Sequence, residues 1–155
     1  MSTPATKLLT SLGINFKVHE YQHDPNTDSY GLEAAEKLGY PYEQVFKTLI
    51  AQLDSGFAVA IVPVNQHVNL KNLAHALGSK KAQMAKPDVA SRLTGYIVGG
   101  ISPIGQKKLL PTVIDELAQL QETVLVSGGK RGFDIELATS DLAQITKAIF
   151  AAIAD

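Results

Sequence analysis

The run from Thr94 to Lys108, TGYIVGGISPIGQKK, has residue types and spacing suited to holding a small polar ligand. It contains four glycines and one proline within fifteen residues. A hydrophobic stretch, Tyr96–Val98, which we predict to be a strand, leads directly into Gly99 and Gly100, and a GxxxP loop ends at Pro103. Glycine lets a ligand approach the backbone closely, and exposed N–H groups can bind an oxyanion or a phosphate. A tight structural turn between two strands is the alternative.

A second glycine-rich segment, Ser127–Gly132, follows an apolar run, Thr123–Val126, which we also predict to be a strand. It contains two adjacent cations, Lys130 and Arg131. The N–H groups of the segment, with either cation, can hold an anion. A wide hairpin loop with solvated charges explains the same residues equally well.

Lys47 is unusual because it lies inside the otherwise apolar run Val45–Ile50. In a strand, Lys47 shares one face with Val45 and Leu49. A lysine with apolar neighbours on its own face is partly desolvated unless its ammonium reaches water. It therefore either projects into a cleft or protects the edge of a sheet from aggregation.

Several familiar catalytic motifs are missing. The sequence has no cysteine, so the protein has no thiol nucleophile of its own and no disulfide. It has no GxSxG motif, which makes a serine hydrolase triad improbable. The segment Gly100–Lys107 matches a phosphate-binding loop only in part, because Gln106 occupies the position of the essential lysine.

The histidines give a weaker signal. His19 and His23 lie four residues apart with Asp24 next to His23, and such a pair could bind a metal. However, Gln22–Pro25 has the composition of a turn, and no third ligand follows at a standard spacing. We therefore expect solvated histidines and no metal site, and we expect no cofactor.

Composition limits the class of protein. A length of 155 residues predicts one domain spanning residues 1–155. The start of the chain lacks the features of a signal peptide, and no apolar run is long enough for a membrane helix, so we expect a cytoplasmic protein. A net charge of −1 argues against nucleic-acid binding driven by bulk charge. A local basic patch remains available from Lys80, Lys81, Lys86, Arg92, Lys107, Lys108, Lys130 and Arg131.

Helix and strand patterns are mixed without regular alternation, which predicts an α+β or α/β fold around a mixed sheet, with a partly closed barrel as one form of that sheet. The strands that we expect, besides the two named above, cover residues 16–21, 45–53, 57–64, 133–137 and a segment near Val113. The helices that we expect cover residues 3–12, 31–38, 70–77 and 87–93, and a last helix after Thr139 with an apolar stripe of Leu142, Ile145, Ile149 and Ile153.

With these motifs in order, the chain resembles the YbaK family of Cys-tRNA(Pro) deacylases, free-standing relatives of the editing domain of bacterial prolyl-tRNA synthetases. The resemblance covers essentially the whole chain. It rests on HEYQHDP, EAAEKLG, FKTL, the GxxxP loop and SGGKRG. It implies an α/β fold with a mixed, barrel-like sheet of six or seven strands and helices around it.

The resemblance also implies which residues form the site. Lys47 would line it as the catalytic residue, and the loop of Gly99, Gly100, Ile101, Ser102 and Pro103 would bind the aminoacyl group through its backbone. Further substrate-binding positions would be Tyr21, Tyr30, Ser127, Gly128 and Asp134. Separately, we expect Lys107, Lys108, Lys130 and Arg131 to form a basic rim that contacts the acceptor end of tRNA.

The implied activity is trans-editing, the removal of cysteine from mischarged Cys-tRNA(Pro), with Cys-tRNA(Cys) as a second candidate substrate. The absence of a protein nucleophile suits a mechanism in which the thiol of the substrate attacks its own ester and releases a thiolactone. A complex with prolyl-tRNA synthetase is left open. Two alternatives remain: a deacylase of another tRNA, such as Ala-tRNA(Pro), that uses water, and a non-catalytic module that binds tRNA or a synthetase.

Overall fold

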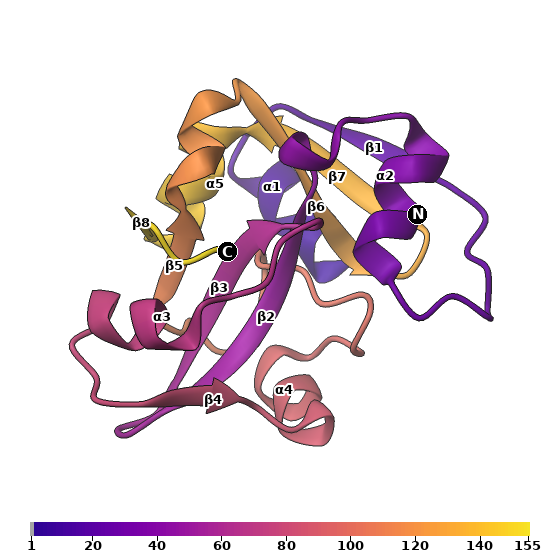
Figure 1. The fold of residues 1–155 in the computed structure, drawn as a ribbon. Coiled ribbons are helices and arrows are strands. Elements are labelled where there is room, and N and C mark those ends of the chain that lie inside the picture. Colours follow the sequence, from indigo (N-terminus) through magenta and orange to yellow (C-terminus); the bar gives the residue numbers. More distant parts are fainter. Residues whose placement is uncertain (1) are drawn as a thin grey trace.

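The computed structural model describes residues 2–155, whose strands and helices are labelled in Figure 1. The α-helices are α1 (Pro4–Ser11), α2 (Tyr30–Leu38), α3 (Leu70–Ala76), α4 (Pro87–Thr94) and α5 (Thr139–Thr146), and the 3-10 helices are η1 (Tyr42–Gln44) and η2 (Glu116–Leu120). The strands are β1 (Phe16–Glu20), β2 (Phe46–Leu53), β3 (Phe57–Pro63), β4 (Ala82–Met84), β5 (Thr112–Asp115), β6 (Thr123–Lys130), β7 (Phe133–Ala138) and β8 (Ile149–Ala151).

The described strands form two sheets. One has the order β1-β7-β6, and the other has the order β4-β2-β3-β5-β8. The second sheet is mixed, because β2 is antiparallel to β3 and β4 whereas β5 is parallel to β3 and β8. The mixed α/β class is thus confirmed. The sheets contain eight strands where six or seven were expected, and they do not close into a barrel within residues 2–155.

Local signals explain several elements. The side chain of Thr3 accepts a hydrogen bond from the Thr6 N–H, and the Thr6 side chain accepts one from the Thr3 N–H, which forms a capping box with Pro4 in the first turn of α1. The β2–β3 hairpin turns at residues 54–56, and the Leu53 N–H donates to the Gly56 carbonyl over 2.6 Å. The predicted hairpin is therefore confirmed.

Three clusters of buried residues hold these elements together. The largest contains residues from both sheets, among them Phe46 and Ile61 of the larger sheet and Val126 and Ile135 of the smaller. A second covers the other face of the larger sheet beneath α3, and a third lies under α2. None of the helices in residues 2–155 combines the length and the apolar character that crossing a bilayer requires.

Two predicted elements are wrong. Tyr96–Val98 is not a strand but part of a turn, because the buried Tyr96 hydroxyl donates to the Ile104 carbonyl over 2.7 Å and so folds the segment onto its own loop. The last helix ends at Thr146, since Lys147 has a φ of 54°. The chain then pairs with β5 as β8. Ile149 is consequently 47% exposed while Ile153 is fully buried.

Candidate functional site

A cavity of about 400 Å³ lies where the two sheets diverge. An isolated parallel bridge between Val45 and Leu125 joins β2 to β6. Beyond this bridge, β2 continues toward its pairing with β4, which begins at Ala51. The cavity lies along the intervening part of β2, and its walls come from both sheets, α2, α4 and the loop after α4. Seven of the residues predicted for the site line it: Tyr21, Tyr30, Lys47, Gly99, Ile101, Ser127 and Asp134.

The side chain of Lys47 is half-buried in this cavity. Its neighbours Val45 and Leu49 line the same cavity, but so do Phe46, Thr48 and Ile50, so the cavity lining does not follow the alternation that the sequence predicted. Within residues 2–155 no carboxylate forms an ion pair with Lys47. Burial lowers the pKa of its ammonium group below the ordinary value. Lys47 is therefore a cation without a protein counter-charge, which can stabilise negative charge on a ligand.

The next residue, Thr48, also lines the cavity and carries a polar side chain. Its hydroxyl oxygen is buried and has no hydrogen-bond partner within residues 2–155. The Val64 N–H donates to the Val45 carbonyl, and the Leu53 N–H donates to the Gly56 carbonyl. The odd-numbered residues of β2 therefore form the hydrogen-bonded pairs with β3. The Thr48 N–H and C=O consequently point to the other edge of the strand. A buried hydroxyl usually has a partner, so the Thr48 hydroxyl is an exception among the described residues.

Asp134 contributes a carboxyl group from β7. It lies opposite Ser127 in the β6–β7 pair, and its side chain is buried. Burial raises the pKa of Asp134 from 3.8 to about 7. Burial, and then the nearby Asp134 charge, raise the pKa of Tyr21 to about 12. Near neutral pH the Asp134 carboxyl can therefore donate or accept a proton, whereas Tyr21 keeps its proton and can donate a hydrogen bond.

The glycine loop contributes only part of its length to the cavity. Gly99, with a φ of 93°, and Ile101 line it, but Gly100, Ser102 and Pro103 do not. A Cβ on Gly100 would lie 2.6 Å from the Lys130 Cα, so this glycine lets the loop pack against the backbone of β6. Ser102 is fully buried, and its hydroxyl accepts the Ile104 N–H over 3.2 Å. Pro103 is also buried.

The second glycine-rich segment is mainly structural. Residues 127–130 continue β6 through a bulge, so the segment is not a wide loop. Gly128 does not line the cavity: a Cβ there would lie 2.5 Å from the Phe133 ring. Its carbonyl accepts the Thr3 hydroxyl over 2.6 Å, which ties α1 to β6. The Lys130 ammonium lies 5.3 Å from the centre of the Phe133 ring.

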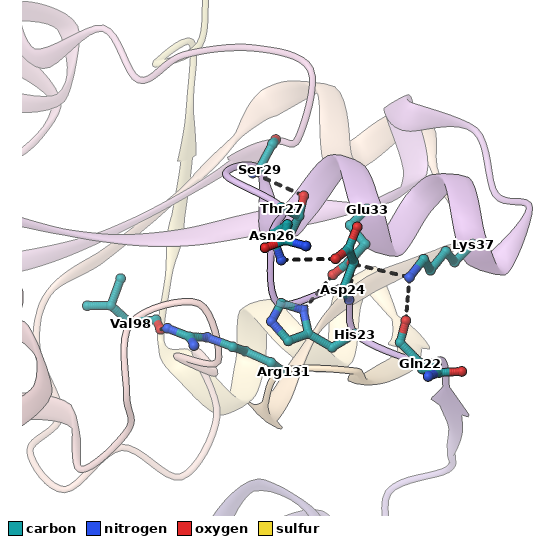
Figure 2. Close-up of polar contacts among 10 residues, drawn as sticks. All are labelled: Gln22, His23, Asp24, Asn26, Thr27, Ser29, Glu33, Lys37, Val98 and Arg131. Carbon is teal, nitrogen blue, oxygen red and sulfur yellow. Dashed lines mark hydrogen bonds and ion pairs between the residues drawn. The ribbon is translucent and has the colours of Figure 1, made fainter.

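Arg131 holds one wall of the cavity in place. Its guanidinium lies 4.6 Å from the centre of the Tyr30 ring, and its Nη2 donates to the Val98 carbonyl over 2.8 Å (Figure 2). A Cβ on Gly99 would lie 2.6 Å from the Arg131 Nε. Arg131 thus connects α2, the glycine loop and the β6–β7 turn. It does not itself line the cavity, nor does Lys107, Lys108 or Lys130.

Glu33, which the sequence analysis missed, orders the loop before α2. Its carboxylate binds the His23 ring over 2.7 Å, the Asp24 N–H over 2.6 Å and the Lys37 ammonium over 3.3 Å (Figure 2). Burial opposes ionisation of Glu33, but these hydrogen bonds keep its pKa below the ordinary value. The His23 ring also lies 5.7 Å from the Tyr30 ring. The i,i+4 pair of Glu33 and Lys37 was the signal available in the sequence.

The two histidines considered as a metal pair have separate partners. His23 binds Glu33, as described, whereas the His19 Nε2 lies 2.9 Å from a carboxylate oxygen of Glu136. Tyr40 and Thr123 also donate to Glu136, over 3.0 and 2.6 Å. Both histidines are partly buried, so the expectation of solvated side chains is wrong.

Comparison with known proteins places this fold and cavity in a family. A family model for the aminoacyl-tRNA editing domain matches residues 24–145. EbsC of Enterococcus faecalis, which carries a provisional name as a Cys-tRNA(Pro)/Cys-tRNA(Cys) deacylase, is 40% identical over 153 residues, covering 97% of this chain and 92% of EbsC. The chain therefore belongs to the aminoacyl-tRNA editing domain family, and its resemblance to the YbaK deacylases is confirmed.

More distant relatives agree with this assignment. The proline–tRNA ligase of Thermosipho melanesiensis is 28% identical over 117 residues, which make up 76% of this chain but 20% of the ligase. A solved structure described provisionally as a trans-editing enzyme for prolyl-tRNA synthetase shares the fold with a TM-score of 0.86 at 24% identity, covering 100% of this chain and 99% of that one. Hypothetical protein APE2540 gives a TM-score of 0.88 at 23% identity, covering 99% of this chain and 100% of that one.

Proposed function

We propose that this protein is a trans-editing deacylase that removes cysteine from Cys-tRNA(Pro). The observation that carries the proposal is the composition of the cavity, which unites Lys47 and the Gly99 loop but has no cysteine or histidine among its lining residues. An aminoacyl ester is already activated, so positioning and charge stabilisation can suffice for its cleavage. The 40% identity with EbsC over 97% of the chain supports the same substrate class.

In the proposed reaction the substrate supplies the nucleophile. The cysteine thiol sulfur forms a bond to the ester carbonyl carbon while the bond from that carbon to the ribose oxygen breaks. The thiol proton ends on the ribose oxygen, so the products are a cyclic thiolactone and free tRNA. Lys47 and the N–H groups near Gly99 would stabilise the negative charge on the carbonyl oxygen. Asp134, with a pKa of about 7, is suited to carry the proton between the two atoms.

A deacylation assay with three forms of tRNA(Pro), charged with cysteine, serine or alanine, tests this function. Contacts alone discriminate such similar side chains by ~1–3 kcal/mol. We expect cysteine to be released more than about 200-fold faster than serine, with thiolactone trapped at early times. Similar rates for all three amino acids would favour attack by water, and no release from any of them would favour a non-catalytic binding module.

The remaining assignments are proposals that rest on this function. We propose that residues 1–155 form a single editing domain, that the protein acts in the cytoplasm where tRNA is charged, and that Cys-tRNA(Cys) is a second substrate. The similarity to an internal part of proline–tRNA ligases supports an association with prolyl-tRNA synthetase. Assays with Cys-tRNA(Cys) and with added synthetase test the last two points.

A further inference from the structure

A second hollow of about 400 Å³ lies beside the end of the β2–β3 hairpin. Three lysines line it: Lys71 from α3, and Lys80 and Lys81 from the segment before β4. All three side chains are exposed, and within residues 2–155 none of them forms an ion pair. We call this site the lysine hollow. Three ammonium groups facing one depression make a local positive site on a protein whose net charge is −1.

The backbone that carries these lysines is held in place. The one acidic residue lining the hollow, Asp54, accepts the Lys80 N–H over 3.0 Å. The Asp54 N–H donates to the Ser79 hydroxyl over 3.3 Å, and that hydroxyl donates to the Lys81 carbonyl over 3.0 Å. Asp54 therefore binds main chain in place of a lysine ammonium, and the lysine charges stay available to a ligand.

Strand β4 connects the lysine hollow to the cavity that holds Lys47. Ala82 and Gln83 line the hollow, whereas Met84 and the following Ala85 line the cavity. An extended strand rises ~3.3 Å per residue, so Lys81 and Met84 lie ~10 Å apart. Along the axis of a nucleic-acid duplex each strand carries one phosphate per ~3.4 Å, so ~10 Å is a separation on the order of a few nucleotides or less. Lys86, which is exposed, adds a cation beside the cavity residues Ala85 and Pro87.

We propose that the lysine hollow binds phosphates of the acceptor strand of tRNA while the aminoacylated end occupies the cavity. This inference rests on the proposed function, because it takes the substrate to be a tRNA ester. The hollow suits this partner better than Lys130 and Arg131 of the predicted rim do, because Arg131 is already bound to Val98 and Tyr30, and Lys130 lies over Phe133. Phosphate contacts of this kind position the substrate without reading its sequence.

The test compares two triple variants that each remove three positive charges. One is Lys71→Gln/Lys80→Gln/Lys81→Gln. The control is Lys7→Gln/Lys17→Gln/Lys147→Gln, which changes exposed lysines that line neither the hollow nor the cavity. For Cys-tRNA(Pro) we expect the hollow variant to raise KM by at least about tenfold and to leave kcat within about twofold. Its log–log salt dependence should lose about two or three units of slope, since each lost phosphate contact removes about one. The control should change neither quantity.

A short substrate separates this inference from the proposed function. The cysteine ester of adenosine reaches the cavity but has no acceptor strand, so wild type and both variants should cleave it equally. Failure of the wild type to cleave either substrate would refute the proposed function. Equal effects of the two triple variants on Cys-tRNA(Pro) would refute phosphate binding by the lysine hollow. A loss of salt-dependence slope confined to a Lys107→Gln/Lys108→Gln variant would refute it as well. If the triple variant does not fold, Lys71→Gln alone should show about one unit of lost slope.

Discussion

Two neighbouring residues of β2 present different chemistry to the same cavity. Lys47 supplies a cation without a protein counter-charge, and Thr48 supplies a buried hydroxyl without a protein partner within residues 2–155. Successive side chains of a strand point to opposite faces. Both can reach the cavity because this part of β2 lies at the divergence of the two sheets.

Replacing Lys47 with alanine should lower kcat/KM for Cys-tRNA(Pro) by on the order of 100-fold or more, the loss typical of one group that stabilises an oxyanion. Lys47→Arg should recover only part of the activity, because a planar guanidinium does not replace a compact ammonium. Steady-state kinetics measure both variants, and circular dichroism checks that they fold. Activity of Lys47→Ala near the wild-type level would remove this residue from the site.

Thr48→Val should separate binding from stability. Valine has the shape of threonine without the hydroxyl, so it removes a buried polar group that lacks a partner and should stabilise the fold by ~1 kcal/mol. If the hydroxyl binds substrate, KM should nevertheless rise several-fold. Chemical denaturation and kinetics measure the two effects. Thr48→Ser keeps the hydroxyl and should keep the wild-type KM, and an unchanged KM in Thr48→Val would contradict substrate binding by this group.

Asp134 should make stability depend on pH. Its pKa is raised to about 7 in the folded protein, whereas an unfolded aspartate titrates near ~3.9. The stabilisation is therefore fully present below about pH 4 and is lost as pH rises through about 7. Relative to Asp134→Asn, the wild type should lose up to ~4 kcal/mol of unfolding free energy over this range. Urea unfolding at several pH values measures it, and parallel curves for the two proteins would disprove the shift.

At the level of elements, the glycine loop is positioned by its packing on β6. The resemblance implies that Gly100 contacts the aminoacyl group through its backbone, and a Cβ built on Gly100 would lie 2.6 Å from the Lys130 Cα. Gly99 and Ile101 reach the cavity because the residue between them allows this close approach. Packing on β6 therefore fixes the position of the loop, just as packing against Arg131 fixes the position of the Tyr30 ring.

Gly100→Ala should lower both stability and activity. The added methyl would meet Lys130 backbone atoms at 2.6 and 2.9 Å, so the loop must move, at a cost of ~1–3 kcal/mol. Gly13→Ala is the control: it is strained by a φ of 69°, but nothing lies within 4 Å of the added carbon. Thermal melting should show a loss of stability in both variants, whereas kcat/KM should fall only in Gly100→Ala. Equal kcat/KM values would show that the loop position does not matter.

At the level of the whole molecule, the walls of the cavity come from both sheets, so the cavity keeps its shape only while both sheets are folded. Asp115, at the end of β5, is buried and links the end of the chain to the larger sheet. Its carboxylate accepts the N–H groups of Ile153 and Ala154, each over 3.0 Å, and of Leu117 over 3.1 Å. Asp115 is not among the residues that line the cavity.

Asp115→Ala should therefore destabilise the fold without altering the chemistry. It leaves three N–H groups without their acceptor; the buried Ile153 N–H costs ~1–3 kcal/mol, and the part-buried Leu117 and Ala154 N–H groups cost less. A total of about 3 kcal/mol would lower the Tm by roughly 6–12 °C in a domain of this size. Below the lowered Tm, kcat/KM should equal that of the wild type. A matching fall in kcat/KM at low temperature would show that the two regions are coupled.

The sequence by itself determined the features that depend on neighbours along the chain. The capping of α1 by Thr3 and the turn at residues 54–56 were both readable, and the structure contains each of them. Ordered motifs such as FKTL and GxxxP also identified the family, because a binding site constrains side chains and backbone conformation at fixed positions. These signals act over a few residues and need no knowledge of distant partners.

The tertiary structure decided which backbone edges are paired and which are open. Apolar periodicity continued the last helix past Thr146, but the edge of β5 offered pairing to Ile149–Ala151 and made them a strand. The same principle applies to Thr48, whose N–H and C=O point to the edge of β2 away from β3. It also explains Gly100 and Gly128, which a motif presents as ligand contacts but which distant segments use for close packing. Burial, pairing and pKa depend on residues far away in sequence, and no local pattern contains them.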